Sequence, residues 1–121
     1  YKKQFPDGFP SPSLFAHAYY INTKAALLGL DAVNGDLSDG GAKYRAVLSD
    51  LEFDTPTGKV SLDERRNAIA DMFLSEVIVG PDGNLVNKVI KVIPQVSQTL
   101  GLSYDEFLKY GQVGRENPTC G

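Results

Sequence analysis

The sequence predicts a mixed α/β fold, because helical and strand periodicities follow one another along a short chain. Between residues 13 and 34, apolar residues recur every three or four positions, as on one face of an amphipathic helix. Between residues 72 and 93, two β-rich arms flank a Gly-Pro-Asp-Gly-Asn turn, which is typical of a hairpin. With 121 residues, the chain has the size of one small hydrophobic core.

The first predicted helix begins after Ser13, whose hydroxyl suits an N-cap, and Gly35 supplies its stop. Its apolar face is formed by Leu14, Ala18, Ile21, Ala25, Leu28 and Ala32. The preceding stretch at 5–13, "FPDGFPSPS", is expected to be a linker, because its three prolines keep the backbone out of a helix. Residues 1–4 are interpreted as the tail of an earlier helix.

The remaining elements are shorter. Tyr44, Val47, Leu48 and Leu51 predict a second helix that packs on the first. Val60 and Leu62 alternate with polar residues and predict a short half-buried strand after a Pro-Thr-Gly turn. Pro94 is expected to end the second hairpin arm, and the spacing of Ser103 and Glu106 predicts a capping box on a short last helix.

Several function classes are disfavoured. "DTPTGK" is not a phosphate loop, because the residue five before Gly58 is Phe53 and Lys59 is followed by Val60, not by Ser or Thr. Gly58 is instead expected to relieve a turn, with Lys59 pointing to solvent. The net charge is −3 and the basic residues are scattered, so nucleic acid is a poor partner. No apolar run approaches the roughly 20 residues that span a bilayer.

The residues do not form a recognisable catalytic or metal motif. The chain has one histidine and one cysteine, at opposite ends, whereas a zinc site needs three or four ligands. The sequence contains no GxSxG elbow, so neither an enzyme nor a cofactor is expected. Asp63, Glu64 and Asp71 could serve acid–base or calcium chemistry, although the adjacent arginines favour a solvated corner. Cys120 can be a free thiol, an intermolecular link or half of a bridge to a segment outside this chain.

The candidate ligand-binding residues are Phe15, His17 and Tyr20, in the first turns of the long helix. A helix N-terminus offers N–H donors and positive potential to an anionic group, such as a ligand carboxylate. The alternative is that Phe15 and Tyr19, at i and i+4, pack into a core while His17 faces water.

An ordered series of short motifs resembles a known family. "PSPSLFAHAYY" leads into a leucine-rich helix that ends in glycine, and "FDTPTGKVSLDE" and "PDGN" follow in order. Together these resemble the C-terminal third of the type I periplasmic solute-binding proteins of branched-chain amino acid and related ABC importers. The resemblance covers nearly the whole chain, including the tail "RENPTC".

The resemblance implies a fold of two Rossmann-like lobes that trap a small ligand between them, of which this chain is a C-terminal fragment without the N-terminal part. Within 1–121, it implies a helix end and linker at 1–13, two helices at 14–53, strand and hairpin segments at 54–93, and a short helix and tail at 94–121. Exposed apolar surface on such a fragment would favour self-association, by exchange of elements between chains.

The resemblance also implies a function. The ligand would be a branched-chain amino acid or another small carboxylate or amide, and His17 would face the cleft between the lobes. The partner would be the membrane permease of the ABC transporter. The location would be periplasmic, or extracellular and membrane-associated in a Gram-positive source. The alternative is a ligand-sensing domain of a receptor or regulator with the same fold.

Overall fold

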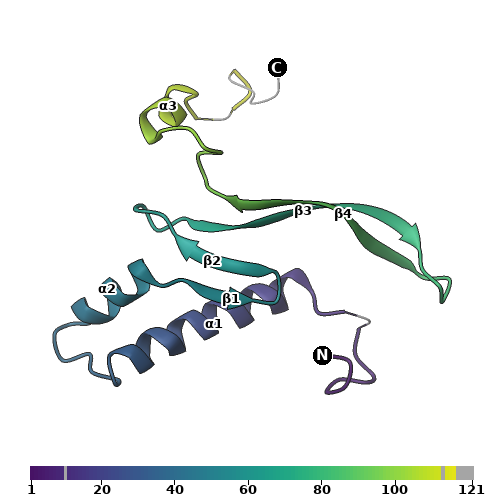
Figure 1. Cartoon of the computed structure of the whole chain (residues 1–121), viewed down its shortest axis with the longest axis horizontal. Helices are drawn as coiled ribbons and strands as arrows, with labels where there is room; N and C mark the ends of the chain where they lie inside the picture. The colour runs from purple at the N-terminus through teal and green to yellow at the C-terminus, as the bar shows by residue number, and fades with distance from the viewer. Residues whose placement is uncertain (10, 113, 117–121) are drawn as a thin grey trace. The chain divides into compact units, whose positions relative to one another are not determined.

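A computed structural model describes residues 1–9, 11–112 and 114–116 of the chain (Figure 1). The chain divides into two compact units, Tyr1–Pro56 and Thr57–Gly121. The first unit carries α1 (Leu14–Ala32), α2 (Ala42–Asp50) and β1 (Phe53–Thr55). The second carries β2 (Gly58–Leu62), β3 (Ala68–Val79), β4 (Leu85–Val96) and α3 (Tyr104–Lys109).

Local signals set both ends of α1, as the sequence predicts. The Ser13 hydroxyl accepts a hydrogen bond from the Ala16 N–H at 3.1 Å, which satisfies one of the free donors of the first turn. At the other end, Gly35 has a φ of +71°, and its N–H donates to the Leu30 carbonyl at 2.8 Å. This hydrogen bond back to the last turn, together with the left-handed backbone conformation, forms a common helix C-terminal cap.

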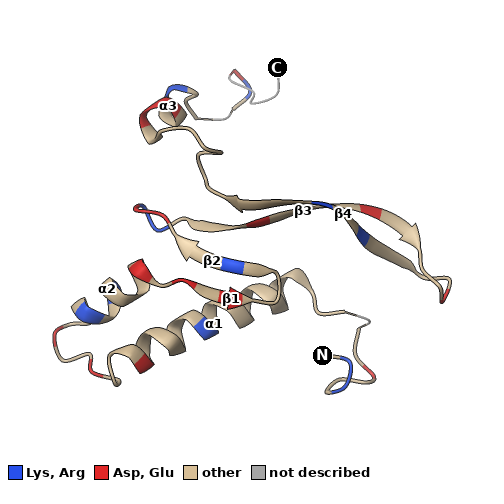
Figure 2. Cartoon of the chain, in the orientation of Figure 1, with Lys and Arg blue, Asp and Glu red and all other residues tan. Residues whose placement is uncertain are grey.

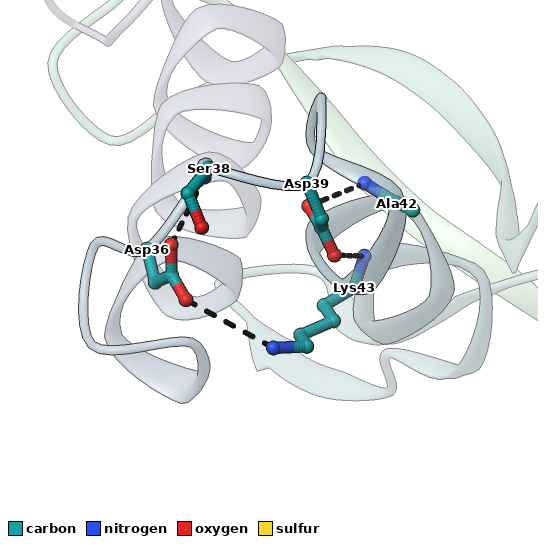
Figure 3. Close-up of polar contacts among 5 residues, drawn as sticks. All are labelled: Asp36, Ser38, Asp39, Ala42 and Lys43. Atoms are coloured by element: carbon teal, nitrogen blue, oxygen red, sulfur yellow. Dashed lines mark hydrogen bonds and ion pairs between the residues drawn. The ribbon is translucent and has the colours of Figure 1, made fainter.

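The loop between α1 and α2 is held by two aspartates (Figure 3). The Asp39 carboxylate accepts from the Ala42 and Lys43 N–H groups at 2.9 and 3.1 Å, so it caps α2 from two residues before the Gly41 N-cap. Asp36 accepts from the Ser38 N–H at 2.9 Å and lies 3.9 Å from the Lys43 ammonium. Hydrogen bonds from Ser38, first its side chain and then its backbone, hold the pKa of Asp36 below its ordinary value.

The predicted packing of the two helices is confirmed, and Gly29 makes it close. The Tyr44 hydroxyl donates to the Ala26 carbonyl of α1 at 3.2 Å. A Cβ at position 29 would lie 2.7 Å from the Tyr44 ring and 2.8 Å from the Leu48 side chain. Any larger residue at 29 therefore requires the Tyr44 and Leu48 side chains, or α2 itself, to shift. On β1, the Asp54 carbonyl accepts from the Lys24 ammonium of α1 at 2.6 Å.

The strands of the second unit follow one another in chain order, β2-β3-β4, with antiparallel pairing. Asp63 makes the β2–β3 turn, where its carboxylate accepts from the N–H groups of Arg65 and Asn67 at 2.9 and 2.8 Å. The β3–β4 turn closes with the Gly80 N–H donating to the Asn84 carbonyl at 2.7 Å. Gly83, with a φ of +79°, supplies its left-handed residue.

The hairpin is longer than the sequence predicts, and the expectation that Pro94 ends its second arm is wrong. β4 runs on to Val96, and the register changes between Ala70, which pairs with Val96, and Met72, which pairs with Ile93. Pro94 and Gln95 thus share the space opposite Asp71. A bulge releases one residue from the hydrogen-bond ladder, so a proline without an N–H is tolerated there. A second register shift lies between Leu74 and Ser75.

The capping box on α3 is confirmed. The Glu106 N–H donates to the Ser103 hydroxyl at 3.3 Å, and the Ser103 N–H donates to the Glu106 carboxylate at 3.1 Å. The Arg65 guanidinium stacks 3.5 Å from the centre of the Tyr104 ring at the start of α3. A cation over an aromatic face is attracted by the ring quadrupole.

The mixed α/β character is confirmed, but the expected hydrophobic core is not present among the described residues. None of their hydrophobic side chains is buried, and the buried positions are the glycines 29, 41 and 80. Apolar surface on both units therefore faces water in this chain.

Candidate ligand site

A hollow of about 570 Å³ in the first unit lies at the start of α1. Its lining is mostly aromatic and apolar, and the His17 imidazole is one of its few polar groups. The lining residues are Tyr1, Phe5, Pro12, Ala16, His17, Tyr20 and Pro56. Small-molecule sites are typically concave and apolar, with a few polar groups that fix orientation. The volume lies within the range of roughly 300 to 1,000 Å³ common for such sites.

The helix start positions one wall of this hollow. Ala16, His17 and Tyr20 lie at successive positions of one α1 face, because residues three and four apart are neighbours on a helix. The His17 N–H donates to the Ser13 carbonyl at 3.1 Å, so the residue belongs to the first turn that Ser13 caps. His17 is half-buried, whereas Tyr20 is exposed.

The N-terminal residues form another wall. The N–H groups of Gln4 and Phe5 both donate to the Tyr1 carbonyl at 2.9 Å, which folds residues 1–5 into a tight turn. The turn brings the rings of Tyr1 and Phe5 within 5.3 Å of each other, at an interplanar angle of 40°. Tilted rings at this distance attract each other through their quadrupoles.

Two of the three candidate ligand-binding residues line the hollow. His17 and Tyr20 do so, whereas Phe15 is 73% exposed and does not belong to the lining. Tyr19 is 72% exposed, so the alternative in which Phe15 and Tyr19 form a core is not what the structure shows. The expectation that residues 1–4 are the tail of a helix is wrong, because they form a turn. The sequence did not indicate Tyr1, Phe5 and Pro56 as lining residues, because 1–4 looked like a helix end, 5–13 like a linker and Pro56 like part of a separate turn.

A second hollow, of about 760 Å³, runs along α1 and reaches the turn that follows it. Its lining mixes aliphatic with polar and charged side chains: Tyr20, Thr23, Lys24, Leu27, Leu28, Leu30, Asp31, Asn34 and Gly35. The Lys24 ammonium is already bonded to the Asp54 carbonyl and lies 5.6 Å from the Phe53 ring centre. The hollow at the start of α1 is the better candidate, because separate turns and a helix converge on it.

Two of the three carboxylates considered for chemistry, Asp63 and Asp71, accept structural hydrogen bonds. Asp63 closes a turn, and hydrogen bonds from Asn67, first the backbone and then the side chain, hold its pKa below the ordinary value. Within the described ranges, no three His, Cys or acidic residues are grouped to hold a metal ion. Cys120 lies outside the described residues. Lys59 is exposed, as expected, and Gly58 has the positive φ of a turn glycine.

Charges of both signs are spread along the described part of the chain. Figure 2 shows lysines and arginines distributed over helices, strands and turns, interleaved with acidic residues. In the part of the chain that the structure describes, no helix is long and apolar enough to cross a bilayer.

No protein-family profile and no curated protein match the chain. A solved structure does. The chain is similar to an ABC transporter substrate-binding protein from Sphaerobacter thermophilus. The match has a TM-score of 0.63 and 27% sequence identity, and it takes in 69% of this chain and 23% of that chain.

This similarity confirms the coarser part of the resemblance: the neighbour is a substrate-binding protein of an ABC transporter, which is a transport protein and not an enzyme. The name of that protein does not specify a branched-chain amino acid, and this chain spans about a quarter of its length.

Proposed function

We propose that this chain is part of the extracytoplasmic solute-binding component of an ABC importer. The main observation behind this proposal is the hollow at the start of α1, which is lined by His17 and Tyr20 and by the tilted pair of rings of Tyr1 and Phe5. The similarity to a substrate-binding protein supports this reading, since such proteins need a pocket for a small solute. The part of the chain that forms the hollow would be one wall of that pocket.

The proposed ligand is a branched-chain amino acid or a related small carboxylate or amide. Aromatic rings, prolines and Ala16 offer apolar contact to an aliphatic side chain. Imidazole and hydroxyl groups form hydrogen bonds with carboxylates and amides, so the side chains of His17 and Tyr20 suit such a ligand. An apolar lining with few polar groups binds such a ligand in one orientation.

The mechanism proposed is capture without chemistry. Two Rossmann-like lobes would close on the ligand by a hinge, and the closed form would deliver it to the membrane permease in the periplasm or on the outer face of the membrane. Closure is driven only by the contacts that the ligand makes better in the closed form than in the open form. In this picture His17 and Tyr20 contribute contacts from one side.

Calorimetric titration with L-leucine, L-isoleucine and L-leucinamide tests this proposal. His17→Ala and Tyr20→Ala are each expected to weaken binding by about tenfold, which corresponds to about 1.4 kcal/mol. Phe15→Ala is the matched control, because Phe15 belongs to the same helical turn but not to the hollow. Its effect should stay within about twofold, a few tenths of a kcal/mol.

Two results would count against the proposal. Binding of none of these probes would remove the ligand class. A loss on Phe15→Ala equal to that on His17→Ala would place the site elsewhere on the helix.

A further inference from the structure

The outer half of the β3–β4 ribbon has two chemically different faces. In this half the register is regular, from Ser75 paired with Val89 to Val79 paired with Leu85, and side chains alternate between faces. One set, named here the uncharged face, contains Ser75, Val77, Val79, Leu85, Asn87 and Val89. The other set, named the charged face, contains Glu76, Ile78, Val86 and Lys88, with Glu76 paired with Lys88.

The uncharged face lies open to solvent in this chain. Val77, Val79 and Leu85 are 63%, 68% and 73% exposed. Burying apolar surface is worth about 25 cal/mol per Å², so a contiguous apolar face in water is unfavourable and typically marks a covered surface. A ribbon of two strands is also marginal by itself, because it needs packing on one face for stability.

We propose that the uncharged face is an internal surface of a larger substrate-binding fold, and that its occupant is the part of that fold which this chain lacks. The match covers only 23% of the neighbour's chain, so most of the neighbour has no counterpart in these residues. In the proposal, that larger part supplies the apolar surface that packs against the uncharged face of the ribbon. The charged face carries Glu76 opposite Lys88 in the register, so the proposal leaves this side in water.

The chemistry of the face favours this occupant. The face has no cation to attract nucleic acid or an anionic membrane, and no anion to attract a basic peptide. Its four aliphatic side chains, with Ser75 and Asn87 between them, match the inner face of a sheet that packs on another layer. The two rival occupants are a second copy of this chain and residues 1–56 of the same chain.

The test compares two valines of β4 with similar exposure on opposite faces. Val89 on the uncharged face is 49% exposed, and Val86 on the charged face is 42% exposed. Each is replaced separately, as Val89→Cys and Val86→Cys, with Cys120→Ser in both so that the new thiol is the only one from this chain. Both variants are made in the 121-residue chain and in a fusion protein. In the fusion, this chain replaces the matching part of the Sphaerobacter thermophilus protein, and any cysteines in the rest of that protein are replaced.

The measurement is the rate at which each thiol reacts with a maleimide, with circular dichroism as the check on folding. In the fusion, the thiol at 89 should react at least about tenfold more slowly than in the 121-residue chain, because reaction must wait for local opening. The thiol at 86 should change by less than about twofold, because its face stays in water.

Three results would overturn the proposal. Equal rates at position 89 in the chain and in the fusion would mean that the rest of the fold does not cover this face; a fusion that unfolds without cooperativity would mean the same. Slow reaction of the thiol at 89 in the 121-residue chain alone would mean that another occupant covers the face. That occupant would be residues 1–56 if light scattering shows a monomer, and a second copy of the chain if the protection increases with concentration.

This inference does not depend on the ligand. It rests on the proposed membership of a substrate-binding fold. A fusion that protects position 89 and binds none of the amino-acid probes keeps the inference and removes the proposed ligand class.

Discussion

The carboxylate of Asp71 on β3 accepts two hydrogen bonds from one residue of β4, Gln95: one from its backbone N–H at 3.0 Å and one from its side-chain Nε2 at 3.1 Å. The same Nε2 also donates to the Lys59 carbonyl on β2 at 3.1 Å. Gln95 takes up a φ of +49° to do this. One residue at a bulge thereby ties three strands together, and a left-handed residue costs backbone energy that these bonds offset.

These bonds predict an acid-sensitive bulge. The hydrogen bonds from Gln95, first backbone and then side chain, lower the pKa of Asp71 in the folded chain. A lowered folded pKa means that the ionised carboxylate stabilises the fold above the unfolded pKa of about 3.9, and that this contribution is lost as pH falls through the folded value. The protection of the Gln95 amide against hydrogen exchange is therefore expected to fall below about pH 4.

Asp71→Asn is the informative variant, because it keeps an acceptor oxygen and removes the charge. Its Gln95 amide should be less protected at neutral pH and should lose the acid dependence. Val86→Ala, on the same ribbon, retains the Asp71 carboxylate and should retain the dependence. An unchanged acid profile in Asp71→Asn would show that another group controls the bulge.

Gly29→Ala is predicted to destabilise the first unit, although alanine is the better helix former. The helix propensity favours alanine by about 0.5–1 kcal/mol, whereas overpacking against Tyr44 and Leu48 costs about 1–3 kcal/mol. The expected net loss of unfolding free energy is about 1 kcal/mol. Urea unfolding monitored by circular dichroism measures it. In a Leu48→Ala background, Gly29→Ala should cost less unfolding free energy than it does in the unchanged chain, because one of the two close contacts is then removed. A stabilised Gly29→Ala chain would contradict the close helix contact.

Gly58 and Gly83 both have positive φ values, +108° and +79°, but different surroundings. A Cβ at 58 would lie 2.6 Å from the Asp71 carboxylate, whereas a Cβ at 83 would meet nothing within 4 Å. Gly83→Ala should cost about 1–2 kcal/mol from backbone strain alone. Gly58→Ala should cost more, because it also displaces Asp71. Thermal unfolding of the two variants side by side checks this, and equal losses would place Asp71 away from Gly58.

Ser13→Ala is predicted to shorten α1 at its start. Removing the hydroxyl that accepts from Ala16 should cost about 1 kcal/mol, with a small loss of helical signal in circular dichroism. Ser11→Ala is the control two residues earlier, outside the helix, and should change neither quantity. If the two variants behave alike, Ser13 does not cap the helix in solution.

Features that depend on near neighbours in the sequence were predictable. The Ser13 cap, the Gly35 stop and the Ser103–Glu106 capping box each rest on hydrogen bonds that span five residues or fewer. The hairpin turn at 80–84 is equally local. Such signals work because the same few residues both make the turn and satisfy its backbone groups.

Features that depend on distant pairings were not predictable. Pro94 looked like a strand end because its missing N–H is visible in the sequence, while the bulge that tolerates it needs Asp71, far away along the chain. β1 spans only Phe53–Thr55, which is too short for alternation to reveal. His17 and Tyr20 were predicted from the helix, but the partners that complete their hollow, Tyr1 and Pro56, come from either end of the first unit.

The absence of buried hydrophobic side chains among the described residues has a thermal consequence. The heat capacity of unfolding follows the apolar area that folding removes from water, and a compact domain shows about 12–15 cal/mol/K per residue. The 121-residue chain alone should fall well below that figure and should unfold over a broad temperature range. Once its apolar surfaces are covered, the heat capacity step should grow in proportion to the area enclosed, so a calorimeter can follow the completion of the fold without any label.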